Sequence, residues 1–117
     1  MAVKVNRTAY EHAQRLIKEG HCVLDGRGEW SKHQPSAAAE NGFIEEHGLD
    51  AYARWHLGVN EAKREHTKER YEFPYGDFEN VHRCALLAAE SRAGQYRHSD
   101  IELAAAHLLG MLAQERS

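Results

Sequence analysis

The sequence predicts an all-α fold, a small single-domain helical bundle that ends in a long antiparallel helical hairpin. Apolar residues recur at helical spacing over two stretches of residues 77–114. Only Arg97 and His98 separate those stretches, and so short a link forces two helices to run antiparallel. The one segment with an extended character, residues 21–25, has no obvious strand partner in the sequence. These observations together favour helices packed on helices.

The N-terminal part is expected to consist of an arm and a helix. Residues 1–7 are expected to form a mobile basic arm, and residues 8–117 a single helical domain. Thr8 and Glu11 have the spacing of a capping box, in which the hydroxyl and the carboxylate each bind a free amide of the first turn. The first helix is therefore predicted over residues 9–19.

The middle of the chain is expected to contain shorter elements. Apolar residues at helical spacing predict two short helices, one ended by Gly48 and the other by Gly58. Residues 60–70 are polar on all sides, and glutamates alternate there with basic residues at near-helical spacing. This pattern is typical of a solvated helix or an ordered loop.

The last third is expected to form the two longest helices. Asp77 is expected to cap a helix over residues 78–96, whose apolar side carries Arg92. Ser99 and Glu102 form a second capping box at the start of the final helix. That helix has the strongest apolar stripe of the chain, made by Ile101, Ala104, Ala105, Leu108, Leu109 and Leu112.

Composition limits the classes of function. A chain of 117 residues is the size of one domain. Its net charge of −3 gives no general attraction to nucleic acid or to an anionic membrane. Two cysteines are too few for a disulfide framework or a four-cysteine zinc site. No signal segment and no apolar run of about 20 residues is present, so a cytoplasmic protein with reduced thiols is expected.

Arg92 is the first candidate for binding a ligand. On the apolar side of its helix it would be buried, and a buried guanidinium needs a carboxylate, carbonyl groups or a bound anion. It can serve as a structural ion-pair partner, extend past the edge of the core into solvent, or bind a small anionic ligand. His82, Tyr75 and His98 are further candidates for such a ligand site. The helix entry at Tyr75 could bind an anion at its amides, although the Asp77 carboxylate competes for that position.

Metal and nucleophile motifs are incomplete. Glu79 and His82 form one Glu-x-x-His step, which places two metal ligands on one helix face. A di-iron bundle needs two such steps, so no cofactor is predicted and a divalent metal at Glu79 and His82 is kept as an alternative. A mononuclear site drawing on His82, His98 or His107 is also compatible with the sequence. Cys84 as a nucleophile would need an adjacent histidine or helix N-terminus and is disfavoured.

The last helix also predicts self-association. Leu103 and Ala106 widen its apolar surface beyond one stripe, as is usual for a helix buried in an interface. Leu103, Ala106 and Leu109 are the interface candidates for a homodimer. As a DNA recognition helix this segment is too acidic, and a nucleic-acid site would have to use the basic N-terminal arm and the basic residues of 60–70.

Two segments resemble short microbial proteins that carry no assigned activity. They are the sequence NRTAYE at residues 6–11 and the run FPYGDFENVHRCALLAAESRAGQYRHSDIELAAAHL at residues 73–108. The resemblance implies a self-contained single domain. It transfers no functional residue to this chain.

Three functions are therefore considered. The first is a non-enzymatic helical binding module that self-associates and whose other partner is unknown. The second is a small metal-dependent or acid/base enzyme with a site near Glu79, His82 and Arg92, in which convergence of these groups would shift their pKa values. The third, ranked last, is a weak nucleic-acid binder.

Overall fold

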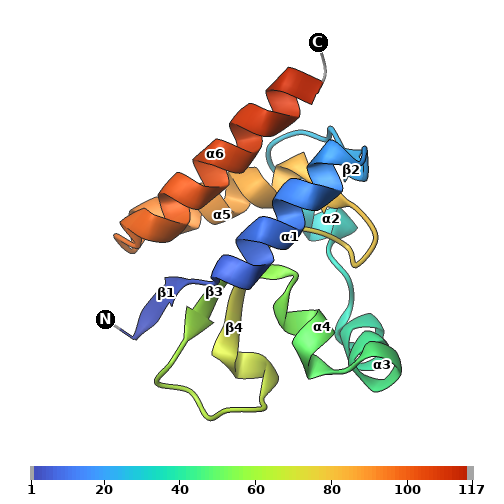
Figure 1. Ribbon diagram of the computed structural model, residues 1–117, viewed down its shortest axis with the longest axis vertical. Coiled ribbons are helices and arrows are strands. Elements are labelled where there is room, and N and C mark those ends of the chain that lie inside the picture. The colour runs from blue at the N-terminus through green and yellow to red at the C-terminus, as the bar shows by residue number, and fades with distance from the viewer. Residues whose placement is uncertain (1, 116–117) are drawn as a thin grey trace.

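The computed structural model describes residues 2–115, so the first residue of the expected arm and the last two of the expected domain lie outside it. Figure 1 shows helices combined with small sheets rather than a helical bundle. The elements follow in the order β1 (Val3–Val5), α1 (Arg7–Lys18), β2 (Cys22–Val23), α2 (Trp30–His33), α3 (Ala37–His47), α4 (Leu49–Ala53), β3 (His56–Asn60), η1 (Lys68–Arg70), β4 (Tyr71–Pro74), β5 (Val81–His82), α5 (Arg83–Gln95) and α6 (Ser99–Glu115).

Two sheets make the fold mixed α/β, and the prediction of an all-α helical bundle is wrong. Strands β1, β3 and β4 form an antiparallel sheet in which β3 is central. Strands β2 and β5 form a parallel pair in which Cys22 lies opposite Val81 and Val23 opposite His82. The strands are two to five residues long, which is too short for alternation to reveal them. Their backbone hydrogen bonds join segments that are distant in sequence.

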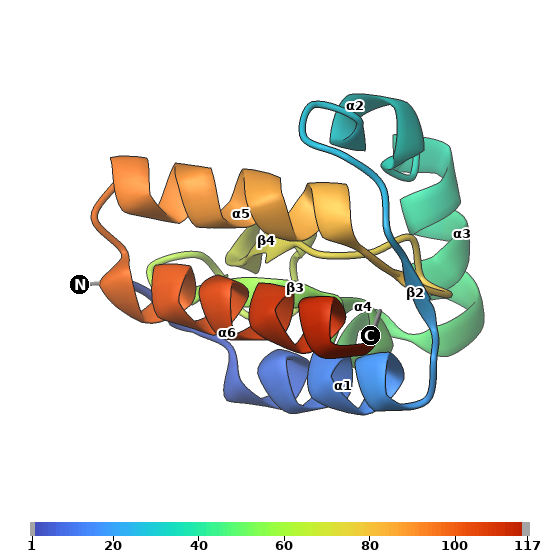
Figure 2. The ribbon, with the colours of Figure 1, turned by 90° about the horizontal axis from the view of Figure 1, so that it is seen from above.

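The long helices form the other part of the core. α5 and α6 make an antiparallel hairpin, and α6 packs between α5 and α1 (Figure 2). The inner faces of these helices and of the larger sheet bury one continuous apolar cluster. Its largest fully buried members are Tyr75, Ile17, Leu57, Leu86, Ile101, Leu108, Leu112 and Val81. No helix between residues 2 and 115 is both long and apolar enough to cross a lipid bilayer.

Helix α1 starts two residues earlier than predicted, and no side chain caps it. α1 begins at Arg7 after Asn6, so Thr8 lies inside the helix and does not cap it. The Asn6 side chain instead donates hydrogen bonds to the carbonyl oxygens of Ala53 and His56 at 3.0 and 3.2 Å. Residues 1–7, expected as an arm, contain β1, which pairs with β3.

The helix predicted over residues 78–96 begins five residues late. Both oxygens of Asp77 are used outside a helix, since Oδ1 accepts from the amides of Glu79 and Asn80 at 3.0 and 2.8 Å and Oδ2 accepts from His82. Phe78 has a φ of 73°, which no helical residue adopts. The chain then forms β5 before α5 begins.

The helix predicted to run up to Gly58 is also shorter, because α4 ends at Ala53 and Gly58 lies within β3. A Cβ at Gly58 would lie 2.7 Å from Cδ2 of Phe73 and 3.1 Å from Cδ1 of Ile101. Glycine therefore marks a close approach of sheet and helix at this position, where the sequence pattern indicated a helix end.

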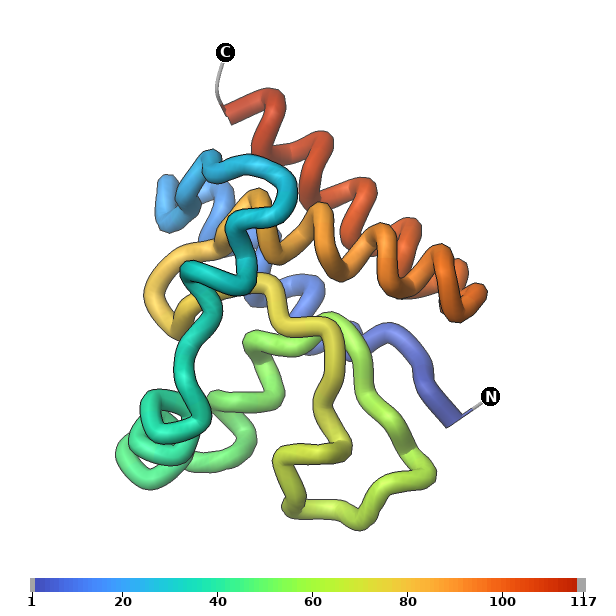
Figure 3. The backbone as a smooth tube through the Cα atoms, turned by 180° about the vertical axis from the view of Figure 1, so that it is seen from behind, coloured from blue at the N-terminus to red at the C-terminus, as the bar shows by residue number. Residues whose placement is uncertain are grey.

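The segment between β2 and α3 contains little secondary structure. It leaves β2, carries the single turn α2, and passes beside the start of α5 (Figure 3). The side chains that tie it to α5 form the candidate site.

Candidate metal centre

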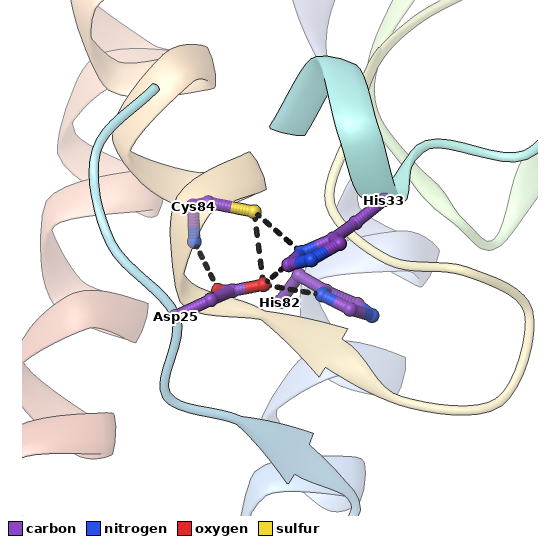
Figure 4. Close-up of side chains that lie close together, drawn as sticks. All are labelled: Asp25, His33, His82 and Cys84. Carbon is purple, nitrogen blue, oxygen red and sulfur yellow. Dashed lines mark hydrogen bonds and ion pairs between the residues drawn. The ribbon is translucent and has the colours of Figure 1, made fainter. Parts of the chain in front are cut away.

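Four side chains that can bind a metal converge at the start of α5. One atom each of Asp25, His33, His82 and Cys84 lies within 4.8 Å of the others. Figure 4 shows the two histidine rings and the thiol directed at the Asp25 carboxylate. Asp25 follows β2, His33 ends α2, and the other two residues lie at the junction of β5 and α5.

The parallel pairing of β2 with β5 positions Asp25. Both strands end at the same edge, so Asp25, the second residue after β2, lies next to the first turn of α5. The amides of a first helical turn have no partner within the helix. Oδ1 of Asp25 accepts the Cys84 amide at 2.7 Å and thus acts as a cap supplied from a remote segment. Arg83 Nη1 donates to the Asp25 carbonyl oxygen at 3.1 Å and fixes the same segment.

The second carboxylate oxygen of Asp25 is surrounded by donors. Oδ2 lies 2.7 Å from Nδ1 of His33, 2.6 Å from Nδ1 of His82 and 3.1 Å from Sγ of Cys84. The side chain of Asp25 is only 5% exposed. Burial alone would raise the pKa of Asp25, but hydrogen bonds from the Cys84 amide and the His82 ring outweigh burial and hold that pKa well below its usual range.

His82 is held from both sides. Its Nε2 lies 2.8 Å from Oδ2 of Asp77, on the opposite side of the ring from Asp25. Burial would lower the pKa of His82, yet the hydrogen bonds to Asp25 and Asp77 raise it overall. The pKa of Asp77 is lowered, since hydrogen bonds from the Asn80 amide and from His82 outweigh its burial. The Trp30 ring packs at 5.8 Å from the His82 ring and covers it.

The arrangement does not fit a cysteine–histidine–aspartate catalytic triad. Such a triad needs a histidine that bridges the thiol and the carboxylate with different ring nitrogens. His33 presents the same nitrogen, Nδ1, to Asp25 at 2.7 Å and to Cys84 Sγ at 3.8 Å. Burial and the neighbouring Asp25 carboxylate also raise the pKa of Cys84 to about 12. The thiol is therefore held protonated in this arrangement, whereas a nucleophile must be a thiolate.

The same atoms fit the ligand set of a tetrahedral metal ion. Two imidazole nitrogens, one thiolate and one carboxylate are ligands that Zn²⁺ accepts in proteins. In a tetrahedral zinc site neighbouring ligand atoms are roughly 3.3–3.6 Å apart, as follows from bond lengths of about 2.0–2.3 Å. The distances of 2.6–3.8 Å around Asp25 Oδ2 and Cys84 Sγ bracket that range. The four ligand atoms lie within 4.8 Å of one another, so the cluster would have to rearrange locally to surround the ion.

Of the two predicted metal ligands, only His82 belongs to this cluster. Glu79 is exposed, and its amide donates to Asp77. The Glu-x-x-His spacing fails because residues 79–82 are not helical, so the two side chains do not share a helix face. Asp25, His33 and Cys84 were not predicted as ligands. The only local signal is the step His82-x-Cys84, which is too common to identify a site by itself.

The predicted anion-site residues do not converge. Arg92 is exposed and lies over the Tyr96 ring at 5.9 Å, so the expectation that it is buried is wrong. The Tyr75 hydroxyl is inside the protein, where it donates to the Arg54 carbonyl oxygen at 2.7 Å and lies 2.7 Å from Nδ1 of His12. His98 packs edge-on against a different residue, Phe73, at 5.9 Å.

The interface candidates lie on the outer side of α6. Leu103 is 70% exposed, while Ala106 and Leu109 are partly buried. Leu103 and Ala106 line a groove of about 690 Å³ that also includes residues of β1 and α1. Leu109 packs against the core of the same chain.

Three of the basic residues considered for nucleic acid are engaged within the chain. Lys4 pairs with Glu61 at 3.0 Å, and Lys68 pairs with Glu40 at 3.0 Å. Arg70 donates to the Lys63 carbonyl oxygen at 2.8 Å. These contacts reduce the positive charge available to a phosphate backbone.

Comparisons of the chain with protein-family models, with curated proteins and with solved structures found no match. Function therefore has to be argued from the site itself.

Proposed function

We propose that this protein binds one zinc ion through Asp25, His33, His82 and Cys84. The observation that carries the proposal is the position of His82, whose Nδ1 points into the cluster while Nε2 lies 2.8 Å from Asp77. Metal-binding histidines almost always use their second nitrogen in this way, because the carboxylate fixes the ring and raises its basicity. A buried histidine whose only role was to precede the first turn of α5 would not need this second carboxylate.

The donor chemistry favours zinc over other divalent ions. A thiolate together with imidazoles suits Zn²⁺, while Mg²⁺ and Ca²⁺ prefer oxygen ligands alone. The charges also balance, since one carboxylate and one thiolate neutralise the ion. Four protein ligands leave no position for water, and the Asp25 and His82 side chains are only 5% and 7% exposed. We infer a closed structural site rather than a catalytic one.

The metal would join two parts of the chain that are distant in sequence. Asp25 and His33 belong to the segment that carries α2, and His82 and Cys84 begin α5. Binding energy at such a site adds to the stability of the folded state. A reducing compartment such as the cytoplasm suits this role, because both cysteines of the described chain are free thiols.

Native mass spectrometry with elemental analysis of untagged protein tests the proposal. We expect one zinc per chain, lost in Cys84→Ser and retained in Cys22→Ser. The two cysteines form a matched pair, since Cys22 lies on β2 outside the cluster. A chain that is purified without metal, and that does not take up Zn²⁺ or Co²⁺ in titration, would refute the proposal.

Self-association through α6 is the second candidate function. Leu103 is 70% exposed beside an open groove, and large exposed apolar side chains beside a concave surface are frequent in interfaces. We expect light scattering to give the mass of a dimer at high concentration and Leu103→Glu to return the mass of one chain. The mass of one chain in the unmodified protein would remove this candidate.

A further inference from the structure

A pocket of about 480 Å³ lies between α2, β4 and α5, next to the proposed metal centre. Its apolar lining includes Phe73 and three alanines of α5, and Trp30 forms another part of the wall. The same Trp30 ring packs on His82. Pockets of a few hundred Å³ with apolar walls and a few polar groups are typical sites for small molecules.

The pocket carries one charge of each sign. Arg92 and Glu72 both line it. Glu72 is held by Asn60, whose amide donates to Oε2 at 3.2 Å. The Arg92 guanidinium rests over the Tyr96 ring at 5.9 Å. Among residues 2–115, Arg92 forms no ion pair with Glu72 or any other carboxylate.

We infer that this pocket binds a small zwitterion with an apolar body, of the class of the apolar amino acids. A ligand with only a negative charge would meet the Glu72 carboxylate, and one with only a positive charge would meet the Arg92 guanidinium. An uncharged ligand would remove water from both groups without replacing it, which is unfavourable. A carboxylate facing Arg92 and an ammonium group facing Glu72 satisfy both, while the alanines and Phe73 contact the apolar body.

This site is separate from the metal ligands, because none of the pocket residues named here belongs to the cluster. The zwitterion site therefore does not depend on the identity of the metal. Trp30 contacts both places, so we expect the fluorescence of the protein to report binding.

The experiment uses three probes with branched apolar bodies of closely similar size. L-leucine carries both charges, 4-methylpentanoate only the carboxylate, and 3-methylbutylamine only the ammonium group. We expect two-dimensional NMR titration of the full chain to show leucine binding, with shifts confined to α2, β4 and α5, up to Arg92 in its last turn. Leucine should bind about tenfold more tightly than either singly charged probe, the ratio expected from one charge-assisted hydrogen bond.

Two variants and two controls identify the charges. Arg92→Gln and Glu72→Gln should each weaken leucine binding about tenfold, by loss of one charge-assisted contact. Arg97→Gln and Glu45→Gln change exposed charges elsewhere and should leave binding unchanged. The NMR spectrum itself shows that each variant is folded.

The inference is overturned if leucine causes no shifts at millimolar concentration. It is also overturned if the carboxylate probe binds as tightly as leucine, or if both pocket variants bind leucine like the unmodified chain. Leucine binding that persists in Cys84→Ser would support this site even if the metal proposal fails.

Discussion

Nε2 of His82 lies 2.8 Å from Oδ2 of Asp77, so the ring is fixed by a group outside the metal cluster. Asp77 is in turn held by the amides of Glu79 and Asn80. The orientation of one proposed ligand therefore depends on a turn that contributes no ligand.

Asp77→Asn tests the importance of this outer contact. The side-chain oxygen of the asparagine can still accept hydrogen bonds from the backbone amides of Glu79 and Asn80, but it cannot bind His82 as a charged acceptor. We expect Zn²⁺ affinity to fall about 10–100-fold at unchanged stoichiometry, measured by competition with a coloured chelator. Glu79→Gln, which alters an exposed neighbour, should leave affinity unchanged. Equal affinities in all three proteins would show that Asp77 only shapes its turn.

Removing the metal should destabilise the protein. A ligand at about a thousand times its Kd stabilises the folded state by about 4 kcal/mol, which for a domain of this size is roughly 10–20 °C in Tm. We expect a chelator to lower the Tm of the unmodified protein by this amount. In His33→Gln the starting Tm should already be low, and the chelator should have little further effect. A chelator effect of equal size in both proteins would contradict a role for His33.

The buried His56 should make stability depend on pH. This residue is 3% exposed. Burial lowers the pKa of His56 to about 4, because burial and the Lys68 charge outweigh the Tyr52 carbonyl and the Glu40 charge, which both raise it. Between pH 6.5 and 4 the unfolded chain takes up a proton that the folded chain refuses, so stability falls as pH falls. From pH 7 to pH 5 the loss should be about 2 kcal/mol.

Urea unfolding of His56→Asn provides the comparison. Asparagine can keep a donor for the Tyr52 carbonyl oxygen, to which His56 Nδ1 is bound at 2.8 Å, but it does not titrate. The unmodified protein should therefore lose about 2 kcal/mol more than the variant between the two pH values. Parallel pH profiles would show that His56 is not the group responsible.

Two glycines should respond in opposite ways to alanine. At Gly58 the new methyl group would collide with Phe73 and Ile101, and overpacking of this kind costs about 1–3 kcal/mol. Gly42 lies inside α3 with no atom near its absent Cβ, so alanine there should stabilise by about 0.5–1 kcal/mol. Chemical denaturation of both variants measures the difference. A neutral Gly58→Ala would show that β3 and α6 can separate at low cost.

The sequence predicted the parts of the fold that depend on local pattern. The hairpin of α5 and α6 was foreseen because apolar residues repeat at helical spacing on both sides of a short link. The sheets were missed because their strands are held by distant partners. Cys22 could be recognised as extended, but nothing near it identifies Val81, its partner in the parallel pair.

The candidate site was missed for the same reason. Its ligands come from a loop, a single helical turn and a strand–helix junction, so no fixed spacing connects them. Asp77 was predicted to cap a helix, which is wrong, because it accepts hydrogen bonds from the amides of a turn and supports His82. Arg92 was expected to be buried because the predicted helix was assumed to be covered on its whole apolar side. The spacing of apolar residues in the sequence does not reveal the open pocket beside Arg92.

The remote cap on α5 has a consequence for the order of folding. Asp25 and the Cys84 amide that it binds are 59 residues apart in the chain. Contacts between such distant residues require closure of a long loop, which is slow compared with the formation of a local helix. The turns of α1 and the α5–α6 hairpin can therefore form before the start of α5 is capped. Metal uptake would then be a late step of folding, and a chain that stops short of it would leave the Cys84 thiol open to oxidation.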